Sequence, residues 1–263
     1  MNSKTSTHSK IIVTMRRSLL LLIGGLLLAI APSLAQQRFI TTGVIEFEKK
    51  VNMHKLIEDN AWTREMKEQM PVYRTTYFNL LFDSTQSVYK SGREVAEDKW
   101  KNFWGAEDNS DNIVHQQYAS GTTTMLKQVF EKKYLIQDSA IQIEWRITDE
   151  TRNIAGFDCR KAVGKMFDSL YVVAFYTDQI VAPTGPEQYT GLPGTILGLG
   201  FPRFYTTIFA TKVELKAPTP VELAAPAKGG QRIKRRELMA QIKDVFKWGS
   251  EEERQKGFWS VIL

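Results

Sequence analysis

Short runs in which apolar and polar residues alternate recur along the chain, with turn-forming residues between them. In the segment Ile141–Ile147 every second residue is apolar. This period of two places apolar side chains on one face and polar side chains on the other, which is typical of a half-buried β-strand. Strands that follow one another through short turns pair antiparallel. Seven segments carry the strand signal: Gly43–Val51, Tyr73–Phe82, Tyr134–Asp138, Ile141–Ile147, Arg160–Phe167, Leu170–Tyr176 and Phe204–Leu215.

Two segments depart from this pattern and indicate helices. The first is Asp59–Gln69, which Pro71 terminates. The second has apolar residues at the spacing of one helix face, namely Leu238, Ile242, Val245 and Phe246. Gly249 is its predicted end. We therefore predict a mainly β fold of the α+β class: an antiparallel curved sheet or open barrel with this C-terminal helix packed against it.

The N-terminus has the order of residues found in secretory signal peptides. A basic start at Met15-Arg16-Arg17 precedes the apolar run Leu19–Ala31, and the small residues Ser33 and Ala35 follow. A membrane anchor is the competing interpretation, but the run is shorter than the roughly 20 apolar residues that a bilayer requires. We predict a signal peptide over residues 1–35, with translation from Met15 as an open alternative. The mature chain is then periplasmic, outer-membrane-associated or secreted, without a membrane span.

The remaining sequence divides into three parts by composition. Residues 36–216 contain the predicted strands and form the β domain. Residues 217–230 form a predicted linker, because they contain Pro218, Pro220, Pro226 and the pair Gly229-Gly230. Residues 231–263 form a helical C-terminal tail.

Charge gives no reason to expect a nucleic-acid partner. The segment 1–35 contains four basic residues and no acidic one, so its removal lowers the net charge from +6 to +2. A local basic cluster remains, made of Arg232, Lys234, Arg235 and Arg236. We interpret it as the solvated face of a helix, although such a cluster also suits phosphates or an anionic surface.

A series of motifs lies between Ile154 and Leu197. Its members are Ile154-Ala155-Gly156-Phe157-Asp158-Cys159-Arg160-Lys161-Ala162, Ala174-Phe175-Tyr176-Thr177, Gly185-Pro186 and Tyr189-Thr190-Gly191-Leu192-Pro193-Gly194-Thr195-Ile196-Leu197. In order and spacing the series closely resembles the GLPGLI family of Bacteroidetes exported proteins, and the resemblance extends more loosely over most of the chain after residue 35. Thr195 stands where the family usually has Leu, and Phe175 where it often has Trp. The resemblance implies a fold and export, but no reaction.

The sequence Gly191-Leu192-Pro193-Gly194 predicts a tight turn. Proline restricts φ to about −65°, and the glycine after it supplies the positive φ of a type II turn. Leu192 and Ile196 then cover apolar surface on either side, which is the structural interpretation that we favour. The alternative is a functional turn in which Leu192 and Pro193 present an apolar lip to a ligand.

Cys159 is the only cysteine, so an intramolecular disulfide is impossible. A thiol nucleophile needs a base, and after residue 35 the chain offers only His54 and His115. Cys159 also lacks the local signatures of cysteine hydrolases, and we interpret it as a buried, small apolar residue. These three residues lie far apart in sequence and do not indicate a zinc site. No nucleotide or cofactor motif is present, and we expect no cofactor.

The polar segment Glu94–Asp111 contains two further groups of candidates. Four carboxylates could form the pair that a glycosidase requires, namely Asp98, Glu107, Asp108 and Asp111, but carboxylates in such a loop are usually solvated. Three aromatic residues either pack in the core or form a recognition surface, namely Trp100, Phe103 and Trp104.

Three functions remain open. We favour a non-catalytic binding or accessory protein of the cell envelope or exterior, which contacts a protein partner or an apolar ligand. Its candidate binding residues are Trp100, Phe103, Trp104, Leu192 and Pro193. The alternatives are a hydrolase that uses Cys159 or the acidic loop Asp98–Asp111, and a purely structural component.

Overall fold

The computed structural model describes residues 39–57, 59–95, 112–166, 170–248 and 250–262. The strands have the following bounds: β1 Gly43–Asn52, β2 Tyr73–Phe82, β3 Gln86–Ser91, β4 Ile113–Gln117, β5 Thr122–Val129, β6 Lys132–Ser139, β7 Glu144–Ile154, β8 Phe157–Met166, β9 Leu170–Thr177, β10 Thr195–Phe201, β11 Thr206–Glu214 and β12 Gln231–Ile233. The helices are α2 Met53–Leu56, α3 Ala61–Gln69, α4 Arg235–Val245 and α5 Glu251–Ile262, with a 3₁₀ turn, η2, at Pro202–Phe204. The predicted signal peptide lies outside the described residues.

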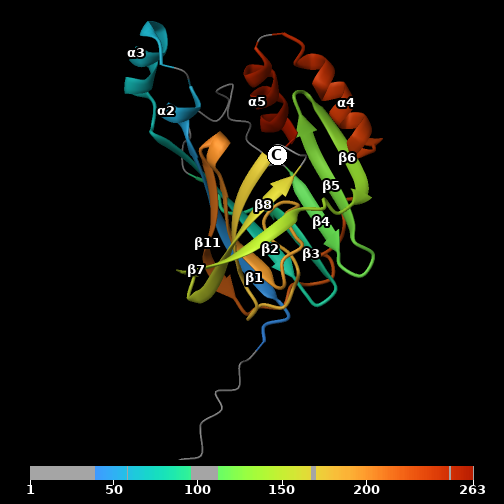
Figure 1. The fold of residues 1–263 in the computed structure, drawn as a ribbon. Coiled ribbons are helices and arrows are strands. Elements are labelled where there is room, and N and C mark those ends of the chain that lie inside the picture. Colours follow the sequence, from blue (N-terminus) through green and yellow to red (C-terminus); the bar gives the residue numbers. More distant parts are fainter. Residues whose placement is uncertain (1–38, 58, 96–111, 167–169, 249, 263) are drawn as a thin grey trace, which may run out of the picture. The chain divides into compact units, whose positions relative to one another are not determined.

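All of the described strands belong to one open sheet, in the order β12-β6-β5-β4-β3-β2-β1-β11-β10-β9-β8-β7 (Figure 1). Every neighbouring pair is antiparallel except β12 and β6, which are parallel. The prediction of a mainly β, antiparallel fold is therefore confirmed, and the sheet does not close into a barrel. Within the described ranges, every helix is too short or too polar to traverse a bilayer.

The hairpin of β7 and β8 shows how local sequence sets the strand bounds. Its two connecting residues, Ala155 and Gly156, both have positive φ, as a two-residue turn of type I′ requires. The turn allows β7 to continue to Ile154, well beyond the predicted end at Ile147. The strand starts at Glu144 rather than at Ile141, because pairing with β8 begins at that residue.

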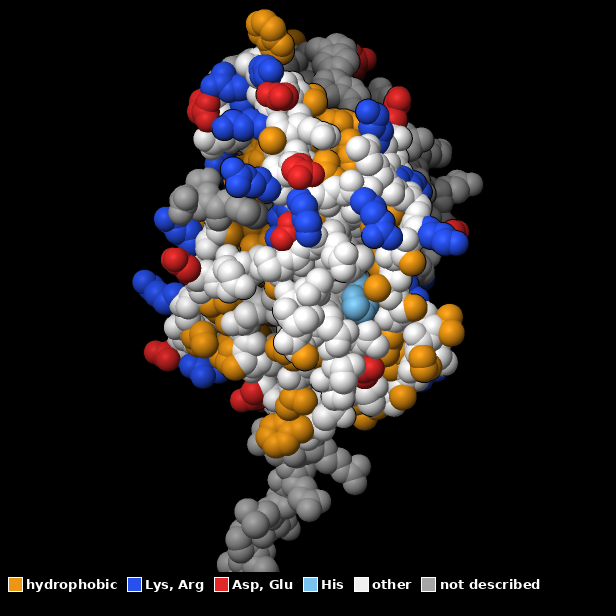
Figure 2. Space-filling model, turned by 90° about the vertical axis from the view of Figure 1, so that its right-hand side faces the viewer, with side chains coloured by type: hydrophobic (Ala, Val, Ile, Leu, Met, Phe, Trp, Pro, Cys, Tyr) orange, Lys and Arg blue, Asp and Glu red, His pale blue; other side chains and the backbone are white. Residues whose placement is uncertain are grey.

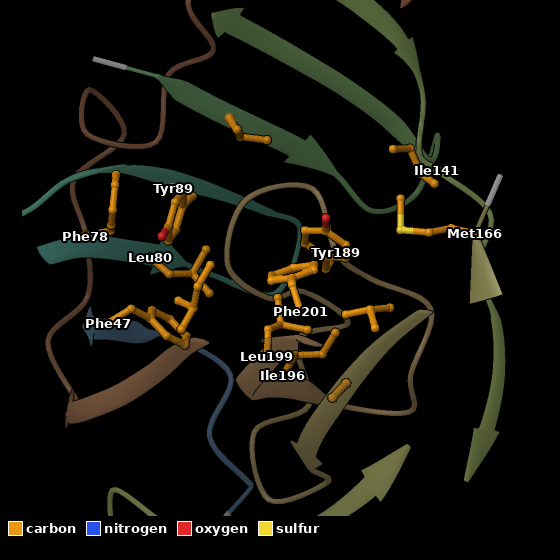
Figure 3. Close-up of a cluster of buried hydrophobic side chains, with 14 of the residues drawn as sticks. Phe47, Phe78, Leu80, Tyr89, Ile141, Met166, Tyr189, Ile196, Leu199 and Phe201 are labelled. Atoms are coloured by element: carbon orange, nitrogen blue, oxygen red, sulfur yellow. The ribbon is translucent and has the colours of Figure 1, made fainter. Parts of the chain in front are cut away.

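The main core lies on the inner face of the curled sheet (Figure 3). Phe47, Phe78 and Leu80 extend from β1 and β2, and the rings of Phe78 and Tyr89 stack at 5.0 Å between centroids. Ile196, Leu199 and Phe201 come from β10. Burial of these large side chains, each roughly 1.5–3 kcal/mol, is the main stabilisation of the sheet.

The segment 217–230, predicted to be a linker, crosses the outer face of the sheet, and we call it the strap. It leads from β11, in the middle of the sheet, to β12 at one edge. Leu223 is buried in a second cluster with Leu81 and Val88. Because neighbouring residues of a strand point to opposite faces, these side chains lie on the face opposite Leu80 and Tyr89. The strap thus covers outer apolar surface with one anchoring leucine.

After the strap, the chain enters α4. Leu238 and Ile242 of this helix are buried members of the main cluster. Phe246 follows the helix as its C-cap, and its ring lies 6.3 Å from that of Phe130. The predicted stop, Gly249, lies outside the described residues. A second helix of the C-terminal tail, α5, follows and buries Trp259 and Val261.

Truncation of the strap anchor tests this arrangement. We expect Leu223→Ala to lower the free energy of unfolding by about 2–5 kcal/mol, because it leaves a cavity between the strap and the sheet. Val221→Ala is the matched control: Val221 lies on the same strap and is 85% exposed, so its truncation should change stability by less than about 0.5 kcal/mol. Urea unfolding measures both. Equal, small effects would show that the strap is not anchored at Leu223.

Candidate functional site

All seven aromatic and acidic candidates of the segment Glu94–Asp111 lie outside the described residues. This holds for Trp100, Phe103 and Trp104, and for Asp98, Glu107, Asp108 and Asp111. Their proposed roles in binding or hydrolysis remain predictions. The other two candidates are described: Leu192 is buried in the main cluster, whereas Pro193 is exposed.

The Gly-Leu-Pro-Gly turn is tighter than the type II turn predicted from sequence. The backbone N–H of Gly194 donates to the carbonyl of Leu192 at 2.9 Å, and a bond between residues i and i+2 closes a γ-turn. Gly191 and Gly194 have φ of +97° and +136°. A Cβ atom at Gly194 would lie 2.1 Å from the carbonyl oxygen of Thr177. Glycine is therefore required here both by backbone conformation and by the close approach of β9.

Residues 183–194, which we call the motif loop, pack into the curled sheet. The N–H of Ile196, in β10 just after the loop, donates to the carbonyl of Thr184 near the start of the loop at 2.8 Å. Trp145 of β7 donates its Nε1–H to the carbonyl of Thr190 at 2.9 Å. Between these contacts Tyr189 is fully buried, with its ring 5.2 Å from that of Phe201 (Figure 3). The loop therefore fills the inner face of the sheet with its own side chains.

On its other side, the motif loop meets polar side chains of β1, β3 and β4. The hydroxyl groups of Ser87 and Thr184 are 2.7 Å apart, and Thr184 also donates to Oε1 of Gln116 at 3.2 Å. The Nζ of Lys49 forms an ion pair with Glu187 at 3.1 Å, and both side chains are largely buried. Gln116 donates from Nε2 to the carbonyl of Glu187 at 3.2 Å. These contacts join the loop to the far half of the sheet.

Two buried tyrosines lie beside this polar cluster. Burial, assisted by the nearby carboxylate of Glu187, raises the pKa of Tyr89 and Tyr189 well above the ordinary value. The cavity next to Tyr89, also lined by Glu187 and Gln188, has a volume of only about 10 Å³. This is the space of roughly one water molecule. This cavity is therefore too small for an organic ligand.

Cys159, His54 and His115, the described residues that could support hydrolysis, each have a different hydrogen-bond partner. Cys159 is fully buried, and burial, followed by the charge of Asp158, raises the pKa of its thiol to about 12. His54 contacts the carbonyl of Met70, and His115 contacts Gln86 at 2.8 Å. Burial lowers the pKa of His115, which favours its neutral form. In the part of the chain that the structure describes, no three His, Cys, Asp or Glu residues cluster so that they could hold a metal ion.

A pocket of about 540 Å³ opens between the strap, the β5–β6–β12 edge and the start of α4. We call it the strap pocket. Its apolar lining residues are Leu135, Ala225, Pro226, Ala227 and Ile233. Its polar lining residues are Thr124, Gln137, Arg232, Lys234 and Glu237. Thr124 and Gln137 are cross-strand partners on β5 and β6, so the sheet supplies a rigid wall to this pocket.

The residues of the basic cluster at the start of α4 have two different roles. Lys234 donates from Nζ to the carbonyl of Gln137 at 3.0 Å, and Arg235 donates from Nη1 to the carbonyl of Ser139 at 3.0 Å. Both attach α4 to the end of β6. The side chains of Arg232 and Arg236 make no hydrogen bond or ion pair with any described residue, and both residues are exposed. Figure 2 shows many Lys and Arg side chains, with Asp and Glu among them, over the upper part of the face that it draws.

Part of the motif series matches the model of a known protein family. Residues 164–198 match the model of a family described as a protein of unknown function, Porph_ging. This span includes the second, third and fourth motifs. No curated protein matches the chain.

Solved structures resemble the fold at low identity. A structure of PNGF-II has a TM-score of 0.50 at 13% identity, over 83% of this chain and 33% of its own. A second crystal form of PNGF-II has a TM-score of 0.49 at 14% identity, over 76% of this chain and 33% of its own. An uncharacterized conserved protein from Thermus thermophilus has a TM-score of 0.39 at 7% identity, over 76% and 94% of the two chains. The chain thus spans about a third of the length of PNGF-II, and the likeness concerns the fold alone.

Substitution of Gly194 tests the close packing of the motif loop. We expect Gly194→Ala to cost about 1–3 kcal/mol for the positive φ and about 1–3 kcal/mol more for the clash with Thr177. Gly156→Ala is the control, because Gly156 also has positive φ but a Cβ atom there meets nothing within 4 Å. It should show the conformational cost alone. Chemical unfolding of both variants checks the difference, and equal losses would contradict the predicted clash.

Thiol labelling tests the inert character of Cys159. With its pKa at about 12, the native thiol has roughly three-thousandfold less thiolate at neutral pH than an unfolded cysteine with a pKa near 8.5. We expect an aromatic disulfide reagent to label one thiol rapidly in guanidinium chloride and only very slowly in the native protein. Rapid labelling of the native protein would show an accessible thiolate and would support the hydrolase hypothesis.

Proposed function

We propose that this chain is an exported, GLPGLI-like binding or accessory protein without catalytic activity, and that its ligand occupies the strap pocket. The export is supported by the basic and apolar order of residues 1–35. The family relationship is supported by the motif series and by the family match within it. Neither identifies a ligand, and the pocket carries that part of the proposal.

The strap pocket is the observation on which the binding function rests. Its volume of about 540 Å³ falls in the range of roughly 300–1,000 Å³ typical of small-molecule sites. Five apolar and five polar residues line it, so it offers a ligand both apolar contact and hydrogen-bonding groups. The motif loop, by contrast, fills the inner face with its own side chains, so Leu192 is better explained by packing than by ligand contact.

The competing hydrolase hypothesis draws no support from Cys159. A nucleophilic thiol is normally exposed, with a lowered pKa and a base in hydrogen-bonding reach. Cys159 is fully buried, and its Sγ lies near the carbonyl of Phe157 at 3.5 Å. The hydrolytic role of the acidic loop Asp98–Asp111 remains a separate prediction, because that loop lies outside the described residues.

Native mass spectrometry of the protein recovered gently from its own cells is the direct test. We expect a stoichiometric small molecule to remain bound to the chain, and its mass to identify the class of ligand. A co-purifying polypeptide would instead support the accessory role with a protein partner. A chain of the bare sequence mass would exclude a tightly held ligand.

Filling the pocket tests the location of the ligand. Thr124 lines the strap pocket, and we expect Thr124→Phe to place a ring there and to remove the bound small molecule from the mass spectrum. Thr122→Phe is the matched control, because Thr122 lies on the same face of β5 and pairs with Ser139 outside the pocket. Retention of the ligand by both variants would place the binding site elsewhere.

A further inference from the structure

We infer that the ligand of the strap pocket is an amphiphile: an apolar group joined to an anionic oxygen group, a carboxylate or a phosphate. This inference rests on the proposed function, since it names the chemistry of the same site. It follows from three features of the pocket: a guanidinium group without a partner among the described residues, a position at a helix start where cations outnumber carboxylates, and an apolar lining.

Arg232 supplies the first feature. It lines the strap pocket, and its side chain has no hydrogen-bond or ion-pair partner among the described residues. The guanidinium group is planar, permanently charged and shaped to bind a carboxylate or phosphate through two parallel hydrogen bonds. Lys234 lines the same pocket and uses its ammonium group for one bond, to the carbonyl of Gln137. An ammonium group has three donors, so Lys234 retains donors for a ligand.

The start of α4 supplies the second feature. The N-terminus of a helix carries a partial positive charge, and acidic residues are favoured there. This helix has Lys234 at its N-cap and Arg235 and Arg236 in its first turn, with Glu237 as the first-turn acid. The carboxylate of Glu237 accepts from the N–H of Lys234 at 3.5 Å, and that of Asp138 accepts from the N–H of Arg235 at 3.2 Å, so both carboxylates serve the helix end. They meet the four cations of the basic cluster, and an anion in the pocket would offset the remaining positive charge.

The apolar lining of the pocket supplies the third feature. The strap residues Ala225 and Ala227 are exposed and Pro226 is half-buried, and they line the pocket together with two buried residues, Leu135 and Ile233. A free inorganic anion would leave this apolar surface wet. An apolar group attached to the anion would remove it from water, which is favourable at about 25 cal/mol per Å².

Three eight-carbon probes, with acetate as a short anion, separate these features. Binding of octanoate, octyl phosphate, octan-1-ol and acetate to the protein is measured by NMR titration. We expect octanoate or octyl phosphate to bind at least about tenfold more tightly than octan-1-ol, the gain typical of one charge-assisted hydrogen bond. Acetate should bind far more weakly than octanoate. The stronger of the two anionic probes distinguishes a carboxylate from a phosphate ligand.

Two arginine variants provide the matched control. Arg232→Ala should abolish the preference for the anionic probes over octan-1-ol. Arg236→Ala removes the same charge from an exposed arginine that does not line the pocket, and it should retain most of the preference. Equal losses in both variants would show a diffuse electrostatic effect and overturn the inference.

The remaining outcomes separate the inference from the proposed function. Equal affinity for octan-1-ol and octanoate would contradict the anionic group but support an apolar ligand in the strap pocket. Equal affinity for acetate and octanoate would contradict the apolar group. If Thr124→Phe leaves the binding of octanoate and octan-1-ol intact, the pocket itself is not the site, and the proposed function fails with it.

Discussion

An open sheet with two apolar faces must cover both of them, and this constraint shapes the rest of the structure. The inner face is covered by the curl of the sheet and by the motif loop, which places Tyr189 and Leu192 in the main cluster. The loop fits only because Gly194 allows the backbone to approach Thr177 closely. The motif that carries the family resemblance is thus explained largely by the packing of the sheet, and no reaction is needed to account for it.

The two sides of the motif loop are bound by different chemistry. Toward β7 and β10 its contacts are backbone hydrogen bonds, the Trp145 indole and apolar packing. Toward β1, β3 and β4 they are polar side chains, with the Lys49–Glu187 ion pair largely buried. A buried charge is costly unless it is paired, so loss of either partner would leave the other uncompensated. The polar contacts therefore fix one position of the loop rather than merely adding stability.

The sequence predicted those parts of the fold in which one face is apolar and the other polar. The segment Tyr73–Phe82 was predicted residue for residue as β2. Strand β5 was missed because Thr123 and Lys127 are buried on its inner side, so the alternation does not separate apolar from polar residues. Strand β10 was missed for the opposite reason: Thr195–Phe201 is buried on nearly every residue, and a run covered on both faces shows no period.

The strap pocket could not be predicted from the sequence, because its walls come from segments far apart in the chain, such as those of Thr124 and Arg232. The basic cluster could be recognised in the sequence, but the different roles of its members could not. Adjacent residues in the chain differ in role because β12 is a strand and α4 begins directly after it, so successive side chains leave the backbone in different directions. Arg235 meets the end of β6, where burial lowers its pKa despite the opposing effect of Asp138. Arg232, in the strand before it, faces the pocket without a partner among the described residues. A cluster that looks uniform in sequence therefore consists of anchors, which the fold has already satisfied, and a cation that remains available to a ligand.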